Sequence, residues 1–124
     1  MTSEFTPLNL HPQLVQAVEE RGYQTPTPIQ AELIPVMITG QDVIGQAQTG
    51  TGKTAAFALP ILQRLSTDRS NVQSLVLAPT RELALQVSKD IEAYGRFSNV
   101  KVLAVYGGAA YGPQISQLKR GVDV

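Results

Sequence analysis

The segment Ala47-Gln48-Thr49-Gly50-Thr51-Gly52-Lys53-Thr54 constrains the fold more than any other part of this sequence. It follows a short apolar run at residues 42–47 and precedes a helical pattern from about residue 53 to residue 65. Glycines between a strand and a helix let successive backbone N–H groups point at phosphate oxygens, and the helix N-terminus adds a partial positive charge. The pattern therefore predicts a nucleoside triphosphate site within a strand–loop–helix unit.

Two side chains of this loop carry the clearest chemistry. Lys53 is placed to bring a positive charge to the β- and γ-phosphates, and Thr54 offers a hydroxyl to the Mg²⁺ that accompanies the nucleotide. The first position is Ala47, where the strict motif has glycine. The alternative is a glycine-rich turn with a solvated lysine, but a strand and a helix in register favour the nucleotide site.

Apolar runs and helical patterns alternate along the rest of the chain. Short, continuous apolar strands that alternate with helices are typical of parallel sheets, whose ligands gather at the carboxyl ends of the strands. We therefore expect an α/β fold of three layers, a parallel sheet flanked by helices. Strands are expected at residues 42–47, 74–78, 100–106 and 122–124, and helices at residues 12–21, from 28 onward, 53–65, 80–95 and 114–120.

Composition narrows the kind of protein. Ten Lys and Arg balance ten Asp and Glu, so any nucleic-acid contact must be local rather than a property of the whole surface. The absence of cysteine excludes disulfides and thiolate metal sites. The longest apolar stretch, residues 55–62, is far shorter than the roughly 20 residues of a membrane span. We expect a single soluble, cytoplasmic domain with no membrane association.

Residues 22–30 have two interpretations. Thr27 and Gln30 have the spacing of a capping box, in which the glutamine side chain reaches back to the backbone of the cap residue. Alternatively, the Gln30 amide reads an adenine edge, which offers a matching acceptor and donor, while Tyr23 or Phe5 stacks on the base. The residues alone favour the cap, and both interpretations can hold at once.

Two more loops follow predicted strands, at residues 79–81 and at residues 107–108. Thr80 alone reads as a helix cap and Arg81 as a surface cation. The other interpretation is a phosphate contact by Arg81 and the helix N-terminus. Gly107 and Gly108 form either a plain turn or a backbone that a ligand approaches closely.

Taken together, these segments resemble the DEAD-box RNA helicase family. Residues 22–30 resemble its Q motif, with Phe5 at the usual distance upstream, and residues 47–54 resemble motif I, where alanine at the first position is normal. Residues 79–84 match motif Ia, and residues 107–108 match the glycine pair. Four motifs stand in the family's order over nearly the whole chain.

The resemblance implies the first part of a RecA-like P-loop NTPase domain that binds ATP and Mg²⁺ and contacts the RNA backbone without reading sequence. Residues 1–40 would form a helical Q-motif region, and residues 41–124 the RecA-like portion, truncated before the D-E-A-D segment. The parent would unwind or remodel RNA duplexes with ATP hydrolysis, whereas these residues alone would lack the catalytic carboxylates and arginines. The implied ATP-binding residues are Phe5, Tyr23, Gln24, Thr25, Gln30, Ala47, Gln48, Thr49, Gly50, Thr51, Gly52, Lys53 and Thr54, with Lys53 catalytic and Thr54 toward Mg²⁺. The implied RNA contacts are Pro79, Thr80, Arg81, Gly107 and Gly108.

Two other interpretations stay open at this point. A nucleotide-binding module of a non-helicase class, such as a small-molecule kinase, would share residues 47–54 but would not need residues 79–84 or 107–108. An inert chain whose order depends on self-association is the other. We favour self-association, by edge pairing or exchange of an element, because unpaired sheet edges and bare apolar faces attract a second copy. The alternative is that the core of residues 42–106 is sufficient and the C-terminal end frays.

Overall fold

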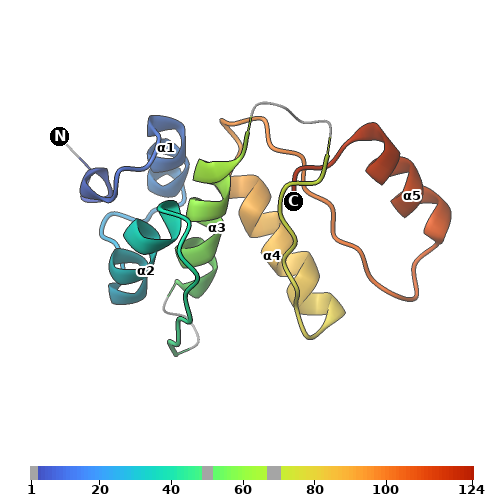
Figure 1. Cartoon of the computed structure of the whole chain (residues 1–124), viewed down its shortest axis with the longest axis horizontal. Helices are drawn as coiled ribbons and strands as arrows, with labels where there is room; N and C mark the ends of the chain where they lie inside the picture. Colours follow the sequence, from blue (N-terminus) through green and yellow to red (C-terminus); the bar gives the residue numbers. More distant parts are fainter. Residues whose placement is uncertain (1–2, 49–51, 67–70) are drawn as a thin grey trace.

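The computed structural model describes residues 3–48, 52–66 and 71–124. The predicted loop residues Thr49, Gly50 and Thr51 lie outside this set. Within the described ranges the regular structure is helical (Figure 1). Its elements are the 3-10 helix η1 (Thr6–Leu8) and the α-helices α1 (Pro12–Glu20), α2 (Pro28–Ile38), α3 (Lys53–Arg64), α4 (Arg81–Tyr94) and α5 (Tyr111–Arg120).

Local signals in the sequence set most of the helix ends. Pro12 and Pro28 are the first residues of α1 and α2, where a missing N–H costs nothing because it has no partner within the helix. The Thr80 hydroxyl accepts a hydrogen bond of 3.1 Å from the Leu83 N–H and so caps α4. The expected helices therefore form close to their predicted limits. The exception is α5, which begins at Tyr111 rather than at residue 114.

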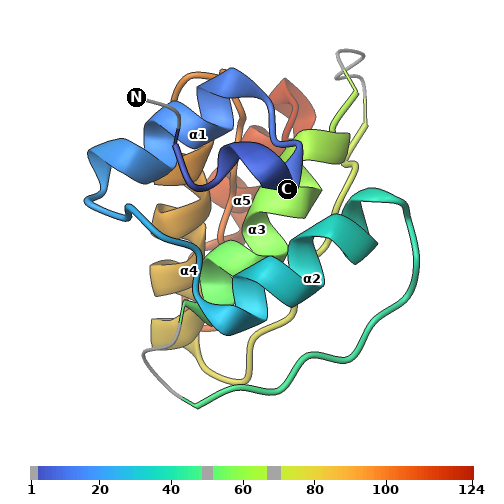
Figure 2. The ribbon, with the colours of Figure 1, turned by 90° about the vertical axis from the view of Figure 1, so that its left-hand side faces the viewer.

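The hydrophobic core is built around α3. This helix stands between α2 and α4, with α1 above the same group (Figure 2), and its Ala58 and Leu59 are fully buried. Apolar side chains from both residues 1–40 and residues 41–124 meet in one cluster. Its buried members are Phe5, Leu8, Leu10, Leu14, Val18, Ile34, Ala55, Ala58, Leu59, Leu62, Val87, Ile91 and Tyr94. The two regions expected from the sequence thus share one core.

The predicted sheet is not formed among the described residues, because none of the four expected segments is a β-strand there. Only its beginning is present. The Lys101 carbonyl accepts from the N–H groups of Asp123 (2.8 Å) and Val124 (3.3 Å), and the Leu103 N–H donates to the Val124 carbonyl at 3.1 Å. On the other side, the N–H groups of Gln73 and Ser74 donate to the Asp123 carbonyl at 2.9 and 3.1 Å.

These bonds give residues 101–103 and 122–124 the pattern of two parallel strands. The expected strand at residues 122–124 pairs with residues 101–103 over this short length. The amides of residues 75–78 find no backbone hydrogen-bond partner in the described part of the chain. A β-ladder requires hydrogen-bond partners along its full length, and here the bonding ends with the pairs at residues 101–103 and 122–124.

Candidate nucleotide and nucleic-acid site

Gln30 joins the start of α2 to the start of α3. Its side chain is almost fully buried, at 1% exposure. Its Oε1 accepts a hydrogen bond of 3.0 Å from the Thr27 N–H, and its Nε2 donates one of 3.1 Å to the Gly52 carbonyl. The glutamine half of the predicted capping box is therefore present. The same amide also reaches Gly52, the residue of the predicted phosphate loop that directly precedes α3, which the capping box alone does not require.

Gly52 is the residue before α3, and its backbone is left-handed, with φ of +82°. A Cβ atom at this position would collide with Nε2 of Gln30. Glycine is therefore favoured here for two separate reasons: the left-handed backbone disfavours other residues, and a Cβ would displace the end of the Gln30 side chain. The close approach of backbone and amide fixes how α3 begins.

The next two residues, Lys53 and Thr54, form the first turn of α3. Lys53 is exposed and Thr54 is half-buried. The first turn of a helix carries N–H groups without intrahelical partners, so it attracts anions, and an exposed lysine adds a full positive charge. This end of α3 has the chemistry of a phosphate site.

Phe5 and Tyr23, the two alternatives for stacking on a base, both contact other parts of the protein. Phe5 is fully buried within the core cluster, so its ring presents no face to solvent. Tyr23 neighbours Tyr94 of α4, and burial together with Tyr23 raises the pKa of Tyr94 above its ordinary value. Arg21 also covers the Tyr94 ring, at 4.9 Å from its centroid, and pairs with Asp90 at 3.1 Å. Tyr23 thus belongs to the contact between α1 and α4.

The remaining predicted nucleotide contacts lie along exposed backbone. Gln24 and Thr25 are exposed in the connection that leads into α2. Ala47 is half-buried and Gln48 is exposed, just before the residues that the structure leaves undescribed. The structure therefore brings Gln30 and Gly52 into contact and sets Lys53 and Thr54 directly after them.

The two loops predicted to contact RNA are brought together by a side-chain contact that the sequence did not predict. The Arg81 guanidinium lies over the ring of Tyr106, 4.9 Å from its centroid. Arg81 opens α4, and Tyr106 directly precedes Gly107 and Gly108. Nothing lies within 4 Å of a Cβ placed on either glycine, and Gly108 has a φ of +85°. The two predicted RNA-contacting loops are therefore neighbours, with open backbone beside a cation.

Gln114 is a second residue that sequence reasoning missed. Its Oε1 accepts from the Tyr106 N–H at 3.3 Å, and its Nε2 donates to the Ala110 carbonyl at 3.2 Å. These bonds tie the first turn of α5 to the glycine loop. The sequence did contain a signal for Tyr106. It is an aromatic residue directly before the glycine pair, and the predicted sheet places it at the same edge as Arg81. Gln114 had no such signal.

Two negative findings apply to residues 3–48, 52–66 and 71–124 alone. No three His, Cys, Asp or Glu side chains gather there in a way that would hold a metal ion. None of the helices in these ranges has the length and apolar character that crossing a bilayer requires.

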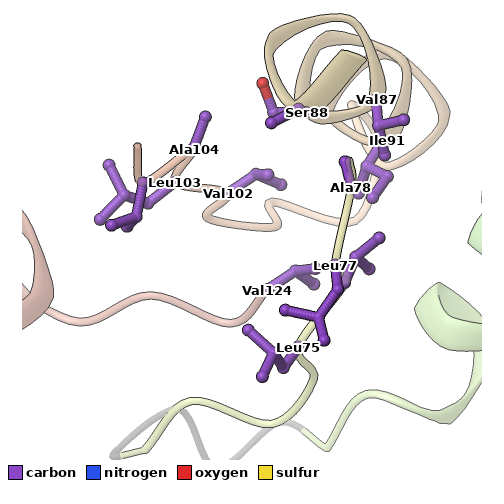
Figure 3. Close-up of a pocket in the computed structure, with 13 residues that line it drawn as sticks. Leu75, Leu77, Ala78, Val87, Ser88, Ile91, Val102, Leu103, Ala104 and Val124 are labelled. Carbon is purple, nitrogen blue, oxygen red and sulfur yellow. The ribbon is translucent and has the colours of Figure 1, made fainter. Parts of the chain in front are cut away.

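A cavity of about 320 Å³ lies between residues 75–78 and residues 102–105, below α4. Figure 3 shows Val124 beside Leu75 and Leu77, with Val87 and Ile91 of α4 near Ala78. The lining is apolar, and the cavity continues the path that Val124 begins between the two extended segments. Its lining includes no residue predicted to contact nucleotide or RNA.

Comparison with known proteins defines the class to which this fold and site belong. Residues 27–124 match the model of the DEAD/DEAH box helicase family, and the chain belongs to that family. It is 46% identical over 124 residues to the DEAD-box ATP-dependent RNA helicase CshA of Bacillus subtilis, covering all of this chain and 25% of the relative. The chain spans about a quarter of the length of the curated relatives that it matches.

Solved structures agree with this assignment. A DEAD box protein from Methanococcus jannaschii superposes with a TM-score of 0.91 at 37% identity, over 99% of this chain and 34% of that one. Dbp5 of S. cerevisiae, bound to RNA and ADP BeF3, superposes with a TM-score of 0.71 at 32% identity, over 81% of this chain and 26% of that one. The chain therefore has the RecA-like fold of these helicases, and the small-molecule kinase alternative has no support.

Proposed function

We propose that this chain provides the ATP-binding surface, and part of the RNA-backbone surface, of an ATP-dependent RNA helicase that unwinds or remodels RNA duplexes. The observation that carries the proposal is the 3.1 Å hydrogen bond from Gln30 to the Gly52 carbonyl. It links the segment proposed to recognise adenine to the loop proposed to hold the phosphates. The names of the relatives, which are ATP-dependent RNA helicases, support the same function.

Gln30 retains hydrogen-bonding capacity for a base. A primary amide has two donors and two acceptor lone pairs, and the bonds to Thr27 and Gly52 use one of each. One N–H and one lone pair remain, which is what an adenine edge requires. In this proposal Gln30 keeps its structural bonds while it recognises adenine, so the cap and the base contact are compatible.

Phosphate and Mg²⁺ binding are proposed for the beginning of α3. Lys53 would place its charge on the β- and γ-phosphates, and the Thr54 hydroxyl would contact the Mg²⁺ of the incoming nucleotide. Lys53 is the catalytic residue in this proposal because it neutralises charge that develops on the transferred phosphate. The carboxylates that would orient the attacking water are not among these 124 residues by the family resemblance, so we propose that the chain binds ATP without turning it over.

RNA contact is proposed at the second group of residues. Arg81, the N-terminus of α4 and the open backbone at Gly107 and Gly108 form an exposed surface suited to phosphates. Such contacts carry no sequence information, so binding would be independent of RNA sequence. A local surface of this kind is compatible with a chain of zero net charge.

We also propose that the chain associates with itself. In this proposal, the parallel sheet of the three-layer fold is completed only when another copy fills the apolar cavity beside Val124. Leu75 and Leu77 are 79% and 85% exposed, and the neighbouring amides lack backbone partners among the described residues. Exposed apolar side chains beside open hydrogen-bonding groups favour pairing with another copy. Sedimentation at micromolar concentration tests this, and a clean 13.4 kDa monomer contradicts it.

Calorimetric titration with Mg²⁺-ATP tests the nucleotide function. We expect binding that Lys53→Ala weakens at least tenfold, because a charge-assisted phosphate contact is worth about 1.5–3 kcal/mol. Lys119→Ala is the matched control, since Lys119 is an exposed lysine in the last turn of α5. Equal affinities of the unaltered chain and Lys53→Ala would show that the phosphate assignment is wrong.

A further inference from the structure

We propose that Tyr106 is a positioning residue for Arg81, holding its guanidinium in the orientation in which it meets an RNA phosphate. The inference rests on the proposed RNA function and extends it to a residue outside the predicted motifs. Its basis is the cation–π contact of Arg81, whose Cζ lies over the Tyr106 ring, 4.9 Å from the centroid. Arg81 is exposed, whereas Tyr106 is half-buried and forms the fixed side of the pair.

The position of an arginine over a ring suits phosphate recognition. A cation–π contact uses no N–H group as a hydrogen-bond donor to an acceptor atom, so the guanidinium donors that face away from the ring stay available for a phosphate. In the described part of the chain Arg81 makes no salt bridge, so no carboxylate there competes for those donors. A free arginine side chain loses rotamer freedom when it binds, and a ring that already holds it reduces that loss.

The backbone that carries the ring is tied to α5 by the side chain of Gln114. Gln114 accepts from the Tyr106 N–H at 3.3 Å and donates to the Ala110 carbonyl at 3.2 Å, which fixes the backbone on both sides of the glycine pair. Gly107 and Gly108 follow directly, with open space where side chains would be. The arginine contacts the ring, and the bare backbone of the two glycines directly follows the ring in the chain.

A different role for Tyr106 would be stacking on an RNA base, as aromatic side chains do in single-strand binding proteins. The two roles differ in their dependence on Arg81. A positioning ring has no function once the arginine is gone, whereas a base-stacking ring keeps its contribution. A double-mutant cycle separates them.

The experiment measures binding of a fluorescently labelled single-stranded oligouridine to the full 124-residue chain by anisotropy at low salt. Arg81→Ala should weaken binding clearly. Tyr106→Leu should weaken it about 2- to 5-fold, the range expected for an exposed cation–π contact. Tyr106→Phe, which keeps the ring, should bind within twofold of the unaltered chain. In the Arg81→Ala background, Tyr106→Leu should have no further effect.

Three results would overturn the proposal. An equal loss from Tyr106→Leu with and without Arg81 would assign the ring to base stacking. No loss from Tyr106→Leu, while Arg81→Ala still weakens binding, would defeat the positioning role and leave the proposed RNA function intact. No loss from Arg81→Ala would defeat both. If Tyr106→Leu lowers the melting temperature, Tyr106→Met replaces it, because an unbranched side chain fills the same space more adaptably.

Discussion

The two candidate functional regions of this chain are built in different ways. Around Gln30 and Gly52 the contacts are buried, join two packed helices and involve backbone groups at 3.0 and 3.1 Å. In the other region, the main contact is that of the exposed Arg81 side chain with the ring of Tyr106, and the segments around it form no β-strand among the described residues. The helical core therefore fixes the proposed nucleotide site, whereas the proposed RNA surface depends on a few exposed contacts.

The largest effect should come from Gly52→Ala. The added Cβ would collide with Nε2 of Gln30, and the left-handed backbone costs an alanine roughly 1–2 kcal/mol. Loss of the buried hydrogen bond adds about 1–3 kcal/mol, so we expect ATP affinity, measured by calorimetry, to fall more than tenfold. The control is Gly108→Ala, which has a similar φ of +85° but open space around it. If both variants bind ATP equally well, the proposed difference between the regions is wrong.

Gln30→Ala separates the structural role of the amide from base recognition. Losing a matched buried hydrogen-bond pair costs roughly 1–3 kcal/mol. We expect the preference for ATP over GTP to disappear, and affinity for tripolyphosphate, which has no base, to fall as well because Gln30 holds Gly52. Titration of the three ligands decides this. An unchanged affinity for tripolyphosphate would show that Gln30 contributes to base recognition alone. Equal ATP and GTP binding by the unaltered chain would show that Gln30 acts only as a helix cap.

Tyr94 predicts how the contact between α1 and α4 responds to alkali. Burial, then Tyr23, raises its folded-state pKa above the ordinary value of 10.0. The folded state therefore retains the proton when the unfolded state begins to lose it. Stability from this group is complete below pH 10 and falls above it, by up to about 1.4 kcal/mol per pH unit.

Urea unfolding between pH 8 and pH 11.5 measures that effect. Tyr94→Phe should reduce the decline above pH 10, whereas Tyr111→Phe, at an exposed position, should not. The same decline in Tyr94→Phe as in the unaltered chain would show that Tyr94 is not the group responsible.

Thr80→Ala should have the smallest effect of the series. It removes the 3.1 Å cap bond to the Leu83 N–H, which is worth about 1 kcal/mol. Because the cap lies at the Arg81 end of the molecule, thermal stability should fall while ATP affinity stays constant. Thr80→Ser keeps the hydroxyl and is the matched control. A parallel loss of ATP binding in Thr80→Ala would mean that the two regions are not independent.

How far the sequence predicts this structure depends on whether the signal is local. Pro12, Pro28 and Thr80 marked helix starts because a proline or a capping hydroxyl acts on its own turn. The sheet was predicted from apolar runs, but its hydrogen bonds need partners distant in sequence, and residues 75–78 have none among the described residues. The strand propensity of a segment does not show whether a neighbouring strand is present to pair with it.

The site shows the same limit. The capping-box spacing correctly placed Gln30 at the N-terminus of α2. Its hydrogen bond to Gly52 joins two helices, and no sequence pattern predicts such a contact. Phe5 was one of two residues considered for stacking on a base, and the structure shows it buried in the core, which only packing decides. The stacking of Arg81 on Tyr106 depends on how two separate loops come together.

Hydrogen exchange with and without ligand tests the separation of the two surfaces most directly. Mg²⁺-ATP should slow amide exchange at residues 27–31 and in the first turns of α3, and leave residues 106–110 unchanged. Oligouridine should do the reverse, protecting residues 80–84 and 106–110. Protection of the same amides by both ligands, or no protection around Gln30 and Gly52 at saturating ATP, would contradict this account.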